Sequence, residues 1–369
     1  MPKAWHGYLR PKGKGMIDLR EAERIVGVMS GSSLDGIDLA LCQFTEEEGQ
    51  WAFRLEKAVT VPWRPVLRER LLQASGASAL EMARLHRDVG QAIGTACDDL
   101  LQGSMAEAIA SHGHTVFHQP EEGLTLQIGS GAHIAAITGL PVVCDLRSMD
   151  VALGGQGAPL VPLGEQLLFP GRRAFLNLGG IANISLHGVD RTMGWDVCPC
   201  NQALDGLAQE AGQPYDADGA LARSGQVDTE LLARLDVLPF YRLPPPRSLG
   251  REWYEAQLRP LLGPGIPLAD RLRTVTEHVA GLVAQALAAH GAEQVLVTGG
   301  GAHNGFLMER IGALGPAVPV LPERELIDFK EAVIFAFLGL LRLRGLPNTL
   351  PSVTGADRGS VGGALYLPY

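Results

Sequence analysis

Short apolar runs alternate with loops of small and polar residues along most of the chain. Residues 25–29 (IVGVM) predict a buried strand, and residues 37–44 (IDLALCQF) alternate between apolar and polar positions as a second strand does. The loop between them, SGSSLDG at 30–36, is rich in turn-forming residues. We therefore expect a hairpin with a polar, glycine-flanked tip.

A second pair of apolar runs repeats this arrangement in the middle of the chain. Residues 174–180 (AFLNLGG) and 181–186 (IANISL) are expected to be strands around a Gly-Gly turn. No wider sequence repeat accompanies the two hairpins. Duplicated hairpins of this kind indicate two related half-molecules that face each other.

Helical spacing and further strands account for most of the remaining chain. Helices are expected over residues 64–75, 79–103, 201–212, 271–290 and 330–343, and another that ends near residue 169. Strands are expected at 124–128 and 141–146. Residues 108–116 are expected to begin as a strand and end in a polar loop, and residues 294–311 to form a strand, a glycine turn and a helix. The three-proline segment 239–250 is expected to be a connector or surface loop. Strands alternating with helices predict an α/β architecture.

The composition indicates a globular chain of about two domains, because 46% of its 369 residues are hydrophobic. Its 46 glycines are about 12% of the chain, above the usual ~7%, and they gather in short loops. Such clustering is typical of backbone that passes close to a ligand. The lobes are expected at residues 25–170 and 171–369, after an N-terminal extension at 1–24.

Charge and cysteine usage exclude several classes of protein. A net charge of −9 argues against a nucleic-acid surface, and no apolar stretch reaches the ~20 residues of a membrane helix. Five cysteines without a disulfide-framework spacing indicate a reducing compartment, so we expect a cytoplasmic protein. The basic N-terminus has no apolar run and is not a signal peptide; Met1 and Met16 both remain open as its first residue.

Three loops carry candidate nucleotide and catalytic chemistry. The 30–36 loop with its flanking Asp38 offers backbone N–H groups for phosphate and carboxylates for Mg²⁺ through water; the alternative is a plain turn. VTGGG at 297–301 would let a nucleotide lie against the backbone, or else only packs a strand on a helix. In GWDVCPCN at 194–201, Asp196 at a strand end is a candidate general base or a turn residue. Cys198 and Cys200 are not expected to hold a metal, because a tetrahedral site needs two more ligands.

Polar residues further along the first half are candidates for binding a substrate. His112, His114 and His118 suit hydrogen bonds to a polyhydroxylated substrate first, a structural role second and a metal third. Arg147 and Asp150 flank a strand end before the loop LGGQGAP, where an arginine can clamp a carboxylate; the alternative is a surface ion pair.

Taken together, these segments resemble the anhydro-N-acetylmuramic acid kinase family. The motifs that carry the resemblance are GVMSGSSLDGID (27–38), HGHTVFHQP (112–120), TLQIG (125–129), DVALGGQGAPLVP (150–162), LNLGGIANIS (176–185), GWDVCPCN (194–201), VTGGGAHN (297–304) and LPSVTGA (350–356). The resemblance implies the two-lobed actin/Hsp70/hexokinase-like (ribonuclease H-like) kinase fold with ATP in a central cleft. It also implies ATP and Mg²⁺, hydrolytic opening of the 1,6-anhydro ring, phosphorylation of O6 in peptidoglycan recycling, and a homodimer.

The resemblance, together with the loops described above, assigns roles to individual residues. Asp196 matches the family's catalytic aspartate. The nucleotide set is Gly31, Ser32, Ser33, Leu34, Asp35, Gly36, Ile37, Asp38, Gly179, Gly180, Gly299, Gly300, Gly301 and Asn304, with Asp35 and Asp38 as the Mg²⁺ candidates. The substrate set is His112, Thr115, Arg147, Asp150, Gln156 and Glu331.

This chain departs from the family pattern in two places. Cys198 and Cys200 stand where many members have glycine, and an Arg-Arg-Arg-Asp pattern becomes Arg147-Ser148-Met149-Asp150. The lost arginines leave a second substrate open, a simpler anhydrosugar such as levoglucosan. A non-catalytic ATP-binding member of the same superfold is the alternative from another class.

Overall fold

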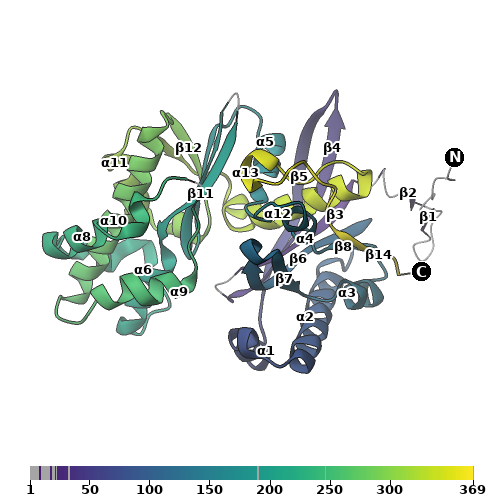
Figure 1. The fold of residues 1–369 in the computed structure, drawn as a ribbon, viewed down its shortest axis with the longest axis horizontal. Helices are drawn as coiled ribbons and strands as arrows, with labels where there is room; N and C mark the ends of the chain where they lie inside the picture. Colours follow the sequence, from purple (N-terminus) through teal and green to yellow (C-terminus); the bar gives the residue numbers. More distant parts are fainter. Residues whose placement is uncertain are drawn as a thin grey trace. The chain divides into compact units, whose positions relative to one another are not determined.

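The computed structural model describes residues 8–9, 17–18, 21, 23–31, 34–188, 191–245 and 247–368 (Figure 1). The chain divides into two compact units, Met1–Pro170 with Glu331–Tyr369, and Gly171–Lys330. Each unit has its own mixed sheet, so the predicted α/β class with two lobes is confirmed. The expected 1–24 extension lies almost wholly outside the described residues.

The first unit is built on a seven-stranded sheet of order β14-β8-β6-β3-β4-β5, with β7 paired to β6. Its strands are β3 (Arg24–Ser30), β4 (Gly36–Glu47), β5 (Gln50–Pro62), β6 (Ala108–Gln119), β7 (Leu124–Ile128), β8 (Val142–Cys144) and β14 (Ala364–Tyr366). Two short strands, β1 (Tyr8–Leu9) and β2 (Ile17–Asp18), form a separate pair. The predicted first hairpin is confirmed, because β3 and β4 pair antiparallel.

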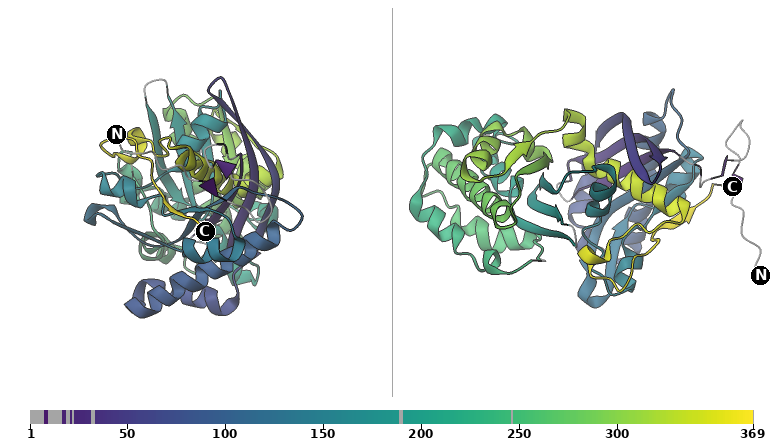
Figure 2. Two further views of the ribbon diagram at one scale, coloured as in Figure 1. Left: turned by 90° about the vertical axis from the view of Figure 1, so that its right-hand side faces the viewer. Right: turned by 90° about the horizontal axis from the view of Figure 1, so that it is seen from above.

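Helices cover both faces of this sheet. They are α1 (Pro65–Leu72), α2 (Ala79–Leu100), α3 (Gly131–Thr138), α4 (Ser148–Ala152), α5 (Val161–Leu168), α12 (Arg324–Arg344) and α13 (Pro351–Thr354). Val26 and Val28 pack in one core cluster with residues of α2. Gly27 lies on the opposite face, where α12 approaches so closely that a Cβ would lie 1.8 Å from the Ala332 carbonyl oxygen. Figure 2 shows the yellow-green helix α12 lying against the purple strands of this sheet.

The close packing of α12 explains a difference from the expected lobes. Residues 331–369 were expected in the C-terminal lobe, whereas Glu331–Tyr369 belong to the first unit. A Cβ on Gly339 would lie 2.2 Å from Ala110 of β6, so this helix meets the first sheet at two glycines, Gly27 and Gly339. β14, at the end of the chain, then pairs with β8.

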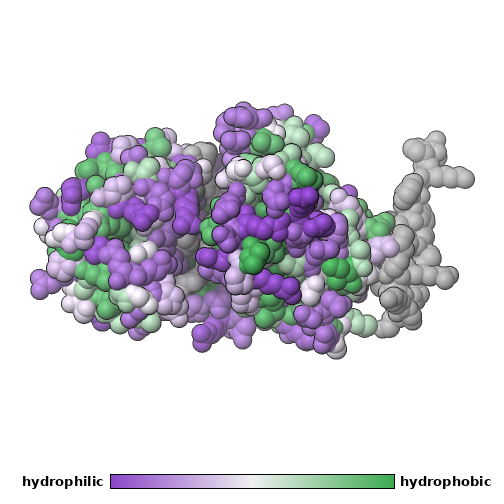
Figure 3. Space-filling view, turned by 90° about the horizontal axis from the view of Figure 1, so that it is seen from below, coloured by the Kyte–Doolittle hydropathy of each residue, from purple (hydrophilic) through white to green (hydrophobic). Residues whose placement is uncertain are grey.

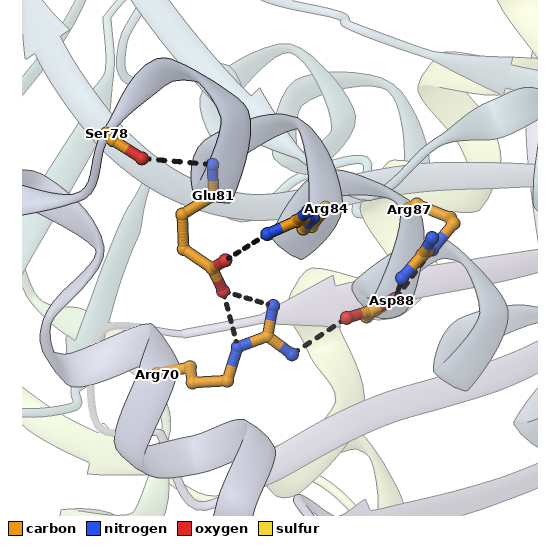
Figure 4. Close-up of polar contacts among 6 residues, drawn as sticks. All are labelled: Arg70, Ser78, Glu81, Arg84, Arg87 and Asp88. Atoms are coloured by element: carbon orange, nitrogen blue, oxygen red, sulfur yellow. Dashed lines mark hydrogen bonds and ion pairs between the residues drawn. The ribbon is translucent and has the colours of Figure 1, made fainter.

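A network of charges holds α1 against α2 (Figure 4). Arg70 of α1 donates to Glu81 at 2.7 and 3.0 Å and to Asp88 at 2.7 Å. Ser78 caps α2 by accepting the Glu81 N–H at 3.3 Å. These pairs are partly solvated, so each contributes modestly, about 0.2–1 kcal/mol.

The second unit has a five-stranded sheet of order β11-β10-β9-β12-β13. Its strands are β9 (Ala174–Leu178), β10 (Ile181–His187), β11 (Thr192–Pro199), β12 (Gln294–Thr298) and β13 (Val318–Val320). Its helices are α6 (Asn201–Ala208), α7 (Ala220–Ser224), α8 (Thr229–Asp236), α9 (Arg251–Trp253), α10 (Leu268–Ala289) and α11 (Gly305–Leu314). The predicted second hairpin is confirmed by the antiparallel β9–β10 pair.

One face of this second sheet is the hydrophobic core of the unit. Leu176, Ile184 and Trp195 lie side by side across three strands and are almost fully buried. They share a core cluster with Val279 and Val283 of α10. The opposite face carries different residues, which form the candidate site described below.

Two sequence expectations are wrong in detail. Residues 112–119 form the end of strand β6 and not a polar loop, because β7 folds back and pairs with them. A left-handed Gly113 (φ +75°) and a register shift accommodate the irregularity. Asp196 lies within β11 and not at its end, since pairing with β10 continues to Pro199.

The surface mixes hydrophilic and hydrophobic residues. On the face drawn in Figure 3, hydrophobic side chains are scattered among hydrophilic ones over both units. Within the described ranges, no helix combines the length and the apolar character needed to cross a membrane.

Candidate active site

Asp196 lies in a row of polar residues that crosses the second sheet. Thr298 of β12 pairs with Asn177 of β9, Asn177 pairs with Asn183 of β10, and Asn183 pairs with Asp196 of β11. Residues directly opposite each other across strands share a face of the sheet. The row therefore lies on the face opposite the hydrophobic core. Sequence reasoning missed Asn177 and Asn183, although their symmetric places about the Gly-Gly turn would have paired them.

The environment of Asp196 is suited to holding and releasing a proton near neutral pH. Burial raises the pKa of Asp196 to about 6, while the Leu249 N–H and the Arg247 cation oppose this rise. The Leu249 N–H donates to Oδ2 at 2.8 Å. No other hydrogen bond to this carboxylate is found in the described residues, which leaves Oδ1 open. A base with a pKa slightly below the working pH is well matched to proton transfer.

Two glycine turns of the second unit meet at Asn201, the first residue of α6. The Asn201 N–H donates to the Gly179 carbonyl, and its side-chain amide donates to the Leu178 carbonyl at 3.1 Å. A Cβ on Gly301 would lie 3.0 Å from Asn201 Oδ1. Gly299 has φ +85°, a conformation that favours glycine. The turns predicted for nucleotide binding, Gly179–Gly180 and 299–301, are thus adjacent.

Buried polar atoms without partners lie beside these turns. Thr298, directly before the glycine turn, is fully buried, and its Oγ1 has no hydrogen bond to any part of the chain that the structure describes. Gln202 Oε1 is likewise buried without a partner, and the Gln202 side chain packs on Gly180. Because such atoms are costly when left unpaired, they favour a polar ligand at this place. Asn304, also predicted for the nucleotide, caps α11, since its Oδ1 accepts the Leu307 N–H at 3.0 Å.

The tip of the first hairpin is only partly described. Ser32 and Ser33 lie outside the described residues. Leu34 is buried in a left-handed conformation (φ 57°), and Asp35 beside it is exposed. Asp38 lies farther along β4 and accepts a hydrogen bond from Thr60 at 2.6 Å.

The other residues predicted in this tip follow the same backbone. Gly31 accepts the Leu34 N–H at 3.3 Å. Gly36 and Ile37 begin β4 and are buried. In the described ranges, no group of three or more His, Cys, Asp or Glu side chains is arranged to hold a metal ion.

The predicted substrate residues of the first unit form one connected cluster. Arg147 donates from Nε to His112 Nε2 at 2.8 Å and from Nη1 to the Gly157 carbonyl at 2.7 Å. A guanidinium only donates, so His112 Nε2 accepts and its proton is on Nδ1, which contacts the Gly113 carbonyl at 3.1 Å. Burial lowers the pKa of His112 well below its usual value, and Arg147 lowers it further. His112 is therefore a neutral support for Arg147.

Arg147 remains a cation in this setting. Burial lowers its pKa to about 10, and the carboxylates of Glu331 and Asp150 act in the opposite direction. The ring of Phe335, one helical turn after Glu331 on α12, lies 6.0 Å from the guanidinium carbon and 4.6 Å from the His112 ring. Sequence reasoning missed Phe335, because its helix reads as uniformly apolar.

Asp150 has a structural task. It is fully buried and accepts hydrogen bonds from the Gly157 N–H and the Thr354 hydroxyl, both at 2.8 Å. The Gln156 N–H donates to the Thr354 carbonyl at 2.7 Å, while the Gln156 side chain is exposed. Asp150 therefore shapes the 153–159 loop and its carboxylate is already occupied by these donors.

The remaining predicted residues of β6 make hydrogen bonds outside this cluster. Thr115 of β6 accepts a hydrogen bond from Gln127 at 3.3 Å. His114 contacts Ser30 at 3.2 Å, and burial lowers the pKa of His114 to about 4. His118 contacts Thr125 at 3.0 Å. These two histidines make separate local contacts along the β6–β7 pair.

Cys198 and Cys200 are free and fully buried. Burial raises the pKa of Cys198 well above its usual value and that of Cys200 to about 12. Both thiols are therefore protonated at neutral pH.

Comparison with known proteins identifies the family. The family description "Anhydro-N-acetylmuramic acid kinase" matches residues 23–368. A protein of that name from Vibrio cholerae is 40% identical over 95% of this chain and 100% of its own length. Another from Gloeobacter violaceus is 39% identical over 90% of this chain and 96% of its own. A ROK family glucokinase structure from Streptomyces griseus is 15% identical, with a TM-score of 0.43 over 85% of this chain and 98% of that one. On the family match and these relatives, the chain belongs to the anhydro-N-acetylmuramic acid kinase family.

Proposed function

We propose that the protein is an ATP-dependent kinase that converts anhydro-N-acetylmuramic acid to N-acetylmuramic acid 6-phosphate and ADP in peptidoglycan recycling. The family match and the names of the relatives support this substrate and reaction. A cytoplasmic location, as the cysteine usage indicates, and a homodimer, as the family resemblance implies, complete the proposal. Light scattering on the purified protein measures the second of these directly.

Asp196 acts as the general base in this proposal. Its open Oδ1 accepts a proton from water as the water oxygen bonds to the anomeric carbon of the sugar. The bond from that carbon to O6 breaks, and O6 attacks the γ-phosphorus of ATP, so that ADP leaves. Positioning and electrostatics supply most of the rate acceleration in phosphoryl transfer.

The glycine turns of the second unit fit a nucleotide. Backbone at Gly299 and Gly301 is too closely packed for a side chain, and the unpaired Thr298 Oγ1 and Gln202 Oε1 offer hydrogen bonds beside them. The family resemblance assigns the phosphates to the segment 31–38, whose sequence is suited to binding them through backbone N–H groups. Asp35 and Asp38 carry the carboxylates that would hold Mg²⁺ through water, and the ion supplies positive charge against the phosphates.

Arg147 supports recognition of the substrate's lactyl carboxylate. Nε and Nη1 are used within the protein, and Nη2 has no hydrogen-bond partner in the described residues. This nitrogen can donate a charge-assisted bond to a carboxylate. An uncharged anhydrosugar such as levoglucosan offers no equivalent group.

The observation that carries the proposal is the partly buried carboxylate of Asp196, with one oxygen fixed and one open. Asp196→Asn keeps the shape but cannot accept a proton at neutral pH. A general base contributes about 10²–10⁴-fold, so kcat should fall at least that much. Calorimetry should show ATP binding unchanged.

Asp98→Asn is a matched control, because Asp98 is an exposed carboxylate on α2. It should keep wild-type kcat. If Asp196→Asn retains more than about a tenth of wild-type kcat, another group is the base.

A further inference from the structure

A proline-rich connector runs alongside the strand that carries Asp196. β11 is an edge strand of its sheet, and the connector (described at residues 239–245 and 247–249) supplies hydrogen bonds to its free side. The Asp196 N–H donates to the Arg247 carbonyl at 3.0 Å, and Arg247 Nε donates to the Asp196 carbonyl at 3.2 Å. Two residues later, the Leu249 N–H donates to Asp196 Oδ2 at 2.8 Å. Among the described residues, every hydrogen bond at Asp196 outside the sheet ladder therefore comes from this connector.

The guanidinium of Arg247 closes the connector on itself. Its Nη1 donates to the carbonyls of Phe240, Tyr241 and Leu243 at 3.3, 3.0 and 2.7 Å. The guanidinium carbon also lies 4.9 Å from the centre of the Phe240 ring. One side chain thus joins the beginning of the connector to the backbone of Asp196. A lysine cannot reproduce this, because its ammonium is a point donor and not a planar fork.

The beginning of the connector is anchored in the core of the second unit. Tyr241 Oη lies 3.1 Å from Nε2 of His278, a buried residue of α10, and His278 Nδ1 lies 2.6 Å from Asp236. The rings of Phe240 and Tyr241 both pack against Trp253, at 5.5 and 5.9 Å between centroids. The connector is therefore a fixed support on which Arg247 can hold β11.

We propose that Arg247 is a positioning residue that fixes the Asp196 carboxylate for proton abstraction, acting through the connector. This inference rests on the proposed role of Asp196 as the base. With Arg247 in place, the Leu249 N–H holds Oδ2 and so fixes the orientation of the carboxylate. Without it, the connector loses four side-chain hydrogen bonds and the Leu249 N–H is no longer held against Oδ2.

The charge of Arg247 gives this role a measurable signature. The cation lowers the pKa of Asp196 against the effect of burial. Its removal should therefore raise the pKa of Asp196, and the acid limb of the pH–activity profile should move to higher pH. The neighbouring titratable groups, Cys198 of β11 and Tyr241 of the connector, have pKa values raised by burial and stay neutral in this range.

The test compares Arg247→Ala and Arg247→Lys with Arg242→Ala, an exposed arginine of the same connector. A misplacement of about 1 Å can cost about 10²-fold, so Arg247→Ala should lower kcat by about 10- to 100-fold with little change in the KM for ATP. The acid limb of its pH profile should move upward. Arg247→Lys keeps the charge, so its acid limb should move less than that of Arg247→Ala while kcat still falls. Arg242→Ala should match the wild type.

A double-mutant cycle separates positioning from a general structural role. If Arg247 acts through Asp196, then Arg247→Ala in an Asp196→Asn background should change kcat by less than about twofold. Additive losses, or a pH limb unmoved in Arg247→Ala, would overturn the proposal. If Arg247→Ala does not fold, Arg247→Lys tests the proposal in its place. A wild-type kcat in Arg247→Lys would then overturn the positioning role of Arg247. High activity of the Asp196→Asn single variant would instead refute the proposed role of Asp196 as the base. That measurement does not depend on any Arg247 variant.

Discussion

At the scale of residues, burial shifts the pKa of one important side chain in each unit. In the second unit, burial makes the Asp196 carboxylate a stronger base than an exposed aspartate. In the first unit, burial keeps His112 neutral so that it can accept a hydrogen bond from the Arg147 cation. Each group is useful for the charge state that its surroundings impose.

Asp196 should lower the stability of the protein at neutral pH. Its folded pKa of about 6 lies above the ordinary value of 3.8, so folding favours the protonated form. The unfolding free energy should therefore fall as pH rises from about 4 to 6, by at most about 3 kcal/mol. Asp196→Asn does not titrate, and urea unfolding should show it gaining on the wild type over this range. Parallel pH dependence of the two proteins would contradict the raised pKa.

Arg147 should discriminate between anhydrosugars. Charged hydrogen bonds contribute about 1.5–3 kcal/mol, so Arg147→Ala should raise KM for anhydro-N-acetylmuramic acid by roughly 10- to 150-fold. KM for levoglucosan, where it is turned over, should change little because that sugar has no carboxylate. Steady-state kinetics with both sugars checks this. Equal losses for both would show that Arg147 mainly holds His112 and the Gly157 loop.

At the scale of elements, strand and helix meet where side chains are smallest. α12 meets β3 at Gly27 of the strand, and it meets β6 at its own Gly339. A Cβ on either glycine would overlap neighbouring atoms. This close contact brings Glu331 and Phe335 of α12 into the environment of Arg147. The packing of one helix therefore determines the composition of the candidate substrate cluster.

Gly27→Ala should destabilise the protein, because its Cβ would lie 1.8 Å from the Ala332 carbonyl oxygen. Overpacking of this kind typically costs about 1–3 kcal/mol, and backbone cannot move as a flexible side chain does. Gly281→Ala is the control: it lies inside α10 with nothing within 4 Å of the added Cβ, and should gain about 0.5–1 kcal/mol. Thermal unfolding of both variants provides the measurement. An unchanged stability of Gly27→Ala would mean that α12 packs less closely on β3 than the structure shows.

At the scale of the whole molecule, what the sequence predicts depends on how local the determinant is. Both hairpins follow from alternation and turn residues within some twenty positions. The strand at 112–119 was missed because its partner β7, and not its own polar composition, determines its conformation. Likewise, Arg247 contacts Asp196 across 51 positions, and Arg147 contacts His112 across 35, which no local pattern encodes.

The identity of the product tests the central claim most directly. The purified protein should be mixed with ATP, Mg²⁺ and either anhydro-N-acetylmuramic acid or levoglucosan, while ADP is followed and the sugar product is weighed by mass spectrometry. We expect ADP release to depend on anhydro-N-acetylmuramic acid and the product to carry one water and one phosphoryl group more than this sugar. In ¹⁸O-water, the label should enter the sugar and not the phosphate. Label in the phosphate, an unopened sugar, or levoglucosan as the better substrate would contradict the account.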